Sequence, residues 1–210
     1  MIKIFILLIL ITYSSTNYAI YAHSTQSNGE TITQYQCIAN SIDYIILFAY
    51  NAYANEGVVS HCIDQIALAQ TAGIKNIDII VNAFPNFTPT KQPSDIANEV
   101  FTAFKGKFRM VWLRTGNLNS GIPTNRGYMM AVYTAFRKLK IPVGIYSSLN
   151  DWESAFGEWM AFSESTLIYS GDSQPNFNDF VEFGLWSKPT MKLFDDSADY
   201  CKLDASLLYY

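Results

Sequence analysis

Apolar residues along this chain fall into short continuous runs that alternate with stretches of helical period. A continuous run predicts a strand that is buried on both faces, because a half-exposed strand alternates apolar and polar residues. Runs of this kind, expected as strands, cover residues 18–22, 43–50, 76–84, 108–113, 142–147, 166–170, 190–194 and 203–210.

Apolar stripes at helical spacing lie between several of these runs, and each stripe would pack one helix onto a sheet. Gly73 and Gly106 follow the first two stripes, where a left-handed residue commonly ends a helix. Pro93 and Pro123 stand near helix starts, where a missing N–H costs little. The alternation predicts parallel strands joined by crossover helices. The stripes cover residues 59–67, 96–104 and 128–139.

The second half of the chain departs from this alternation. Beyond Phe156 the helical period fades, and three strand-like runs follow one another. Five β/α units followed by three strands predict an α/β fold, a modified TIM-like barrel with an irregular second half. An open, doubly wound sheet fits the same pattern, because alternation does not show whether a sheet closes.

The N-terminal segment has the layout of a secretory signal peptide. Lys3 precedes an apolar run over residues 4–11, and polar residues 12–16 follow it. We expect cleavage after Thr16, which leaves residues 17–210 as a single monomeric domain. A transmembrane helix needs about 20 apolar residues, so we expect no membrane span and a secreted, extracellular protein.

Charge and cysteine content limit the classes of ligand and of covalent cross-link that we expect. The net charge of −4 offers no excess of cations to neutralise phosphates, so nucleic acid is not an expected partner. The spacing of Cys37, Cys62 and Cys201 fits no metal-site pattern, which predicts one disulfide and one buried thiol without a metal. Closure of a barrel brings the chain ends together and favours Cys37–Cys201, although all three pairings remain open. Asn86 heads a glycosylation sequon in a proline-flanked loop.

Four strings of residues keep their order and separations over residues 18–210. They are MVWLRTG (Met110–Gly116), GIYSS followed by Trp152, PNFNDFVEFGLWSKPTMK (Pro175–Lys192) and the closing SLLYY. In these strings the chain resembles the lysozymes of glycoside hydrolase family 25, the Chalaropsis type, and in particular its nematode members. The resemblance implies a barrel of five β/α units plus three strands, and cleavage of the β-1,4 bond between N-acetylmuramic acid and N-acetylglucosamine without any cofactor or metal.

The acidic residues that such an enzyme needs are missing at the positions that match the family. Tyr21 stands where the family's first strand ends in Asp, and Ser206 stands at the Asp of the last strand. Arg114 and Gly116 replace the Asp and Glu of the fourth strand's Asp-x-Glu. Glycoside cleavage needs one carboxylic acid to protonate the leaving oxygen and a second carboxylate at the sugar carbon. The resemblance therefore implies a lysozyme-like protein that is catalytically inactive.

The alternative to an inactive protein is an enzyme whose catalytic acids stand at other positions of the chain. Asp204 lies two residues before Ser206 on the same strand face, and Asp195 follows the preceding strand run. An active peptidoglycan-cleaving lysozyme would use Asp204 and Asp195 in place of the missing groups.

Several residues are expected near the C-terminal mouth of the barrel, where barrel proteins place their sites. Aromatic rings there can stack on sugars. Arg114 either binds an anionic ligand group or pairs with an internal acid. The resemblance implies innate immune defence against bacteria and a partner that is a peptidoglycan or chitin-type glycan, or a protein in a signalling role. The candidate ligand-binding residues are Tyr21, Tyr50, Arg114, Tyr146 and Tyr169.

Overall fold

The computed structural model describes residues 18–23, 29–42, 44–52, 57–83, 91–116, 118, 120–162 and 164–210. The expected signal peptide and the Asn86 sequon lie outside these residues. Within the described part of the chain, no helix is both long and apolar enough to cross a membrane.

Nine strands and five helices are described. The strands are β1 (Tyr18–Ala22), β2 (Tyr44–Asn51), β3 (Gly57–Val58), β4 (Asn76–Asn82), β5 (Val111–Arg114), β6 (Val143–Ser147), β7 (Leu167–Ser170), β8 (Met191–Tyr200) and β9 (Leu203–Tyr209). The helices are α1 (Ile32–Ala39), α2 (His61–Ala72), α3 (Pro93–Phe104), α4 (Ile122–Lys138) and α5 (Leu149–Phe156).

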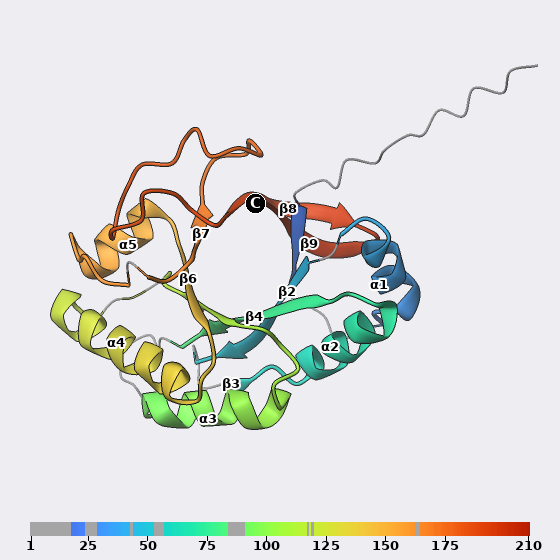
Figure 1. Ribbon diagram of the computed structural model, residues 1–210, viewed down its shortest axis with the longest axis horizontal. Coiled ribbons are helices and arrows are strands. Elements are labelled where there is room, and N and C mark those ends of the chain that lie inside the picture. The colour runs from blue at the N-terminus through green and yellow to red at the C-terminus, as the bar shows by residue number, and fades with distance from the viewer. Residues whose placement is uncertain are drawn as a thin grey trace, which may run out of the picture.

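The sheet closes on itself, so the open doubly wound alternative is wrong. β1 pairs in parallel with β2 and antiparallel with β9, which joins the two ends of the strand order. Eight strands form the barrel in the order β1, β2, β4, β5, β6, β7, β8 and β9, and β3 adds to the edge of β2. β9 is antiparallel to both of its neighbours, and the other neighbours in the barrel are parallel. Figure 1 shows the helices along the left, lower and right sides of this barrel.

Two apolar cores follow from closure, because each strand is covered on both faces. The outer core lies between the strands and the helices and includes Ile66, Val100 and Phe104 from the predicted stripes. The inner core fills the barrel with side chains from all eight strands. At its centre Trp112 lies against Gly144, where an added Cβ would be only 2.4 Å from the indole ring. Large and small residues on neighbouring strands therefore share the interior.

The C-terminal hairpin is longer than the sequence pattern predicts. β8 continues to Tyr200 and turns through Cys201 and Lys202, whose φ angles of 55° and 63° are those of a tight hairpin turn. A disulfide joins Cys201 to Cys37 in α1, and Cys62 is a free, buried thiol. Figure 1 shows the hairpin reaching across to α1. The pairing that barrel closure favours is thus the one in the structure.

Element ends differ from the predicted ranges by a few residues, and no predicted range covers three short elements, α1, β3 and α5. Gly73 takes a left-handed φ of 92° and ends α2 as expected. At the end of α3, Lys105 is itself the left-handed cap, with a φ of 46°, and Gly106 follows it. The left-handed turn therefore begins one residue before the glycine.

Candidate functional site

Three side chains from separate strands meet at the rim of the barrel, at the end where the parallel strands finish. Tyr21 comes from β1, Arg114 from the end of β5, and Tyr146 from β6, where it is the register partner of Arg114. The guanidinium of Arg114 lies over the Tyr146 ring, 5.4 Å from its centroid. Tyr21 and Tyr146 are 7% and 8% exposed and belong to the inner core. We call this group the mouth cluster.

The tyrosines of the mouth cluster are protonated hydrogen-bond donors at neutral pH. Burial raises the pKa of Tyr21 well above its ordinary value, and the nearby Arg114 charge offsets only part of that effect. Burial likewise raises the pKa of Tyr146, and the nearby Arg114 charge acts to lower it. A phenol that holds its proton this firmly is a poor acid catalyst but a good hydrogen-bond donor.

Arg114 does not take the internal acid partner that was one of its two expected roles. Its side chain is exposed, and among the described residues no carboxylate lies within ion-pair distance of its guanidinium. Because β5 ends at Arg114, the side chain projects at the rim rather than into a packed layer. Its charge remains available to a ligand.

A second group of side chains joins β1 to β9 beside the mouth cluster. Tyr21 and Ser206 are register partners, and Nε2 of His23 lies 2.6 Å from Oγ of Ser206. The His23 ring lies 4.9 Å from the Tyr21 ring, centroid to centroid. Nδ1 of His23 is 3.9 Å from the Asp204 carboxylate, whose side chain is 62% exposed. No residue pattern predicts this link, because it depends on the antiparallel register between the two ends of the chain.

Among the other acids near the rim, Asp204 has a second acid, Asp199, as its register partner across the β8–β9 hairpin. Gly116 lies two residues after Arg114, and a Cβ atom added to Gly116 would meet no other atom within 4 Å. The Asp195 carboxylate accepts a hydrogen bond from the Ser197 amide, 3.1 Å away, in a local turn. Asp196 lies near enough to Tyr146 to help raise its pKa. Asp195 and Asp204 are therefore placed at the rim, each in contacts of its own.

Tyr50 and Tyr169 are not brought to the mouth cluster. The register of β2 shifts between Phe48 and Tyr50, and this bulge turns Tyr50 to the outer core, where it is fully buried. Its hydroxyl donates to Glu99 of α3, 3.0 Å away. Tyr169 also lies in the outer core and packs edge-on against Phe180. Both side chains support the wall of the barrel.

The segment after β7 is held to the barrel by a buried ammonium group. The Lys192 side chain is fully buried on β8 and donates to the carboxylates of Asp172 and Asp179. Burial acts to lower the pKa of Lys192, but hydrogen bonds to both acids outweigh it and raise that pKa. This ion pair fixes the loop that carries the PNFNDF string.

A buried carboxylate lies near the opposite end of the barrel. Asp78 accepts hydrogen bonds from the Tyr44 hydroxyl and from Nε1 of Trp112, the latter at 2.9 Å. Nε of Arg109 approaches its other oxygen at 3.5 Å. Burial raises the pKa of Asp78, as a general acid requires, but its partners belong to the N-terminal half of the barrel and not to the rim. Within the described residues, no group of three His, Cys, Asp or Glu side chains is arranged to hold a metal ion.

The family model described as "Lysozyme-like protein 1" matches residues 14–194 of this chain. Among curated proteins, the chain is 26% identical to "Probable GH family 25 lysozyme 4" of Dictyostelium discoideum, with 97% of each chain covered. It is 24% identical to "Lysozyme-like protein 7" of Caenorhabditis elegans, with 89% of this chain and 71% of that protein covered.

A solved structure shares the fold at low sequence identity. The modular autolysin LytC from Streptococcus pneumoniae, in complex with a synthetic peptidoglycan ligand, superposes with a TM-score of 0.67 and 12% identity. The superposition covers 92% of this chain and 46% of that one.

Proposed function

Because this chain belongs to the lysozyme-like proteins of glycoside hydrolase family 25, we propose that it binds a cell-wall glycan at the mouth cluster and does not cleave it. The observation that carries this proposal is the chemistry of the rim. Tyr21, Arg114 and Ser206 occupy the strand ends where the family resemblance expects acids.

The residues at the strand ends that match the family's acids do not supply the groups that hydrolysis requires. Cleavage needs a carboxylic acid and a carboxylate on either side of the scissile bond, about 5 to 9.5 Å apart. Arg114 is a permanent cation and Tyr21 is a phenol with a raised pKa, so neither protonates a leaving oxygen or stabilises an oxocarbenium-like centre. Loss of the general acid alone removes roughly 10²- to 10⁴-fold of rate.

The same rim is suited to holding a sugar. Tyr21 and Tyr146 present aromatic rings and hydroxyl donors, and Arg114 adds a charged donor with no internal acid among the described residues. LytC, which shares the fold, was solved with a peptidoglycan ligand. A lactyl carboxylate on muramic acid would complement the Arg114 guanidinium as a charge-assisted pair.

We extend the proposal to secretion and to a role in antibacterial defence or signalling through a bound partner. The Cys37–Cys201 disulfide supports export, because such bonds persist in oxidising compartments. Expression of the full chain in its source cells should release a protein that lacks residues 1–16, which N-terminal sequencing of the medium would detect.

Calorimetry with soluble muropeptides and chitin oligomers tests the binding. Arg114→Ala should weaken muropeptide binding about tenfold, the usual scale for a charge-assisted hydrogen bond. Arg137→Ala is the matched control, because Arg137 is also exposed but lies in the last turn of α4. Equal binding by wild type and Arg114→Ala would refute the role of Arg114.

Turnover of purified peptidoglycan tests the absence of catalysis. We expect none from the wild type, and activity that Asp204→Asn or Asp195→Asn abolishes would establish the relocated-acid lysozyme instead. The combined variant Tyr21→Asp, Arg114→Asp, Gly116→Glu, Ser206→Asp restores the family acids. Gly116→Glu has free space for its side chain, so measurable turnover by this variant would show that the missing acids alone silence the wild type.

A further inference from the structure

Charge is segregated along this chain in a way that the net charge of −4 conceals. Between Glu99 and Asp151 the sequence carries eight Lys and Arg residues and no Asp or Glu. From Asp151 to the C-terminus it carries eleven Asp and Glu and three Lys. The fold determines whether these opposite charges mix on the surface or stay apart.

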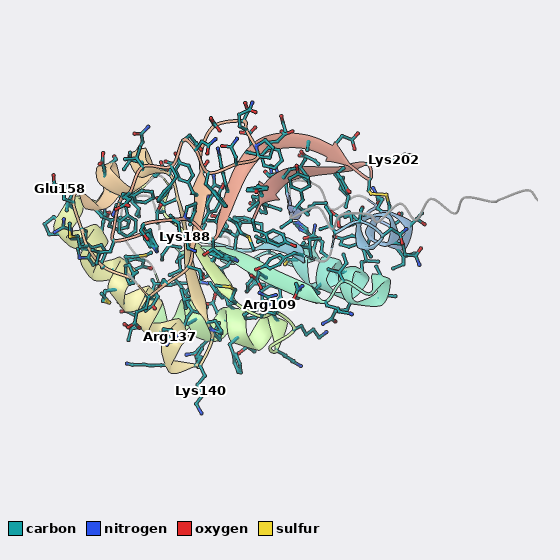
Figure 2. All side chains as sticks on the ribbon, turned by 45° about the horizontal axis from the view of Figure 1, so that its top comes forward. Arg109, Arg137, Lys140, Glu158, Lys188 and Lys202 are labelled. Carbon is teal, nitrogen blue, oxygen red and sulfur yellow. A yellow bond between two sulfur atoms is a disulfide. The ribbon has the colours of Figure 1, made fainter. Side chains whose placement is uncertain are left out.

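The fold gathers half of the chain's 14 Lys and Arg residues at one end of the barrel. In a parallel barrel, every loop that leads from a helix into the next strand lies at the N-terminal end of the strands, opposite the mouth. Three such loops, together with the last turn of α4, hold seven exposed basic residues. Figure 2 shows Arg109, Arg137 and Lys140 along the same lower side of the molecule. We call the set the basic end: Lys75, Lys105, Lys107, Arg109, Arg137, Lys138 and Lys140.

Few acids neutralise the basic end. Arg109 approaches Asp78 at 3.5 Å, and its guanidinium also lies 4.8 Å from the centroid of the Tyr44 ring. For the other six residues, no carboxylate of the described part of the chain lies within ion-pair distance. Arg109 is thus held in place by its contacts with Asp78 and Tyr44.

A hollow of about 230 Å³ opens within the basic end. Its polar lining consists of Gln70, Lys75, Lys107 and Arg109, and no acidic side chain lines it. Gly106, between two of the cationic positions, keeps the wall free of a side chain. A concave site with three cations and an amide donor complements a phosphate group.

We propose that the basic end binds a flexible polymer of phosphodiester-linked units, of the glycerol phosphate type, with one phosphate seated in the hollow. Seven cations spread over three loops and the last turn of α4 match repeated charges better than a single small anion. A stiff nucleic-acid duplex would extend beyond the basic end toward the acidic part of the surface, whereas a flexible chain can stay within it. This surface is opposite the mouth cluster, so the proposal does not depend on glycan binding there.

Fluorescence anisotropy with a labelled, lipid-free glycerol phosphate polymer tests the proposal on the full folded protein. Binding should weaken with salt, with a log–log slope of about −2 for three phosphate contacts. Lys75→Glu/Lys107→Glu should weaken binding at least tenfold, because each basic residue near an anionic surface contributes roughly a fivefold change in affinity. Circular dichroism would verify that each variant is folded.

Matched variants and competitors decide the outcome. Lys107→Glu should weaken binding, and Lys202→Glu, the same charge change on an exposed residue of the β8–β9 turn, should not. Arg114→Ala should leave polymer binding unchanged. Equal losses from Lys107→Glu and Lys202→Glu, or no salt-dependent binding, would overturn the proposal. Tighter binding to duplex DNA, to phosphatidylglycerol vesicles or to inorganic phosphate would overturn the assigned ligand class.

Discussion

Replacing Cys37 and Cys201 by Ser removes a cross-link between residues 164 positions apart. The chain-entropy relation for a loop of that length gives about 17 cal/mol/K, or about 5 kcal/mol at 25 °C, as the destabilisation of the unfolded state by the disulfide. Residual structure in the unfolded chain reduces this figure, so the measured loss should lie between about 2 and 5 kcal/mol.

The native state should tolerate both substitutions. Cys37 is exposed and Cys201 is half-buried, so two Ser side chains leave no cavity in either core. The hairpin also has other contacts to the region of α1. Nε2 of Gln34 donates to the Lys202 carbonyl at 2.8 Å, and the hydroxyls of Ser41 and Tyr200 lie 2.7 Å apart. The hairpin should therefore stay docked, and the effect should fall on the unfolded state.

Urea unfolding followed by tryptophan fluorescence measures this loss, with and without a reductant. Reductant should shift the wild type to the midpoint of the Cys37→Ser/Cys201→Ser variant and leave that variant unchanged. An unchanged free energy of unfolding, with an unchanged denaturant slope, would refute the reasoning. A variant that fails to fold would also refute it, because the native contacts would then depend on the cross-link.

Two further predictions concern the inner core and the anchored loop. Gly144→Ala should destabilise the protein by about 1 to 3 kcal/mol through overpacking against Trp112, while Gly116→Ala, with open space around its Cβ, should leave the melting temperature nearly unchanged. Burial acts to raise the pKa of Asp179, but hydrogen bonds from Lys192 and backbone amides hold it below its usual value. The stabilisation of the folded state by ionised Asp179 is therefore present above the unfolded pKa of about 3.9, and it is lost as the pH falls through the lower pKa of the folded state. Urea titrations of wild type and Asp179→Asn should differ clearly at pH 7 and converge in acid, and a constant difference would contradict the pairing.

The strands were predictable because closure makes both of their faces apolar. In β2, Ile45, Ile46 and Leu47 are all fully buried, with Ile46 in the inner core and its two neighbours in the outer core. A strand that is buried on both faces in this way appears in the sequence as a continuous apolar run. The second half of β8 has no continuous apolar run, because Asp195 to Tyr200 pair with β9 alone, past the last β7 partner, and are polar or partly exposed.

The site was less predictable, since small backbone changes decide which way a side chain faces. A one-residue irregularity in β2 turns Tyr50 from the interior to the α3 side, and no residue type in that run signals it. The contact of His23 with Ser206 depends on β1–β9 register in the same way. The net charge also failed to indicate an anion-binding surface, because it sums the cations of the basic end with the acids of the rest of the chain.

The scaffold and the rim chemistry are separable because different atoms supply them. Tyr21 and Ser206 pair through their main chains, so barrel closure does not depend on which side chains stand there. Carboxylates at these strand ends would place like charges close together, at a cost to stability that only catalysis justifies. Tyr21, His23 and Ser206 instead contact one another, and Arg114 lies over Tyr146. A barrel can thus keep its fold while its rim loses hydrolysis, and for that reason the rim residues, not the fold, must decide what this protein does.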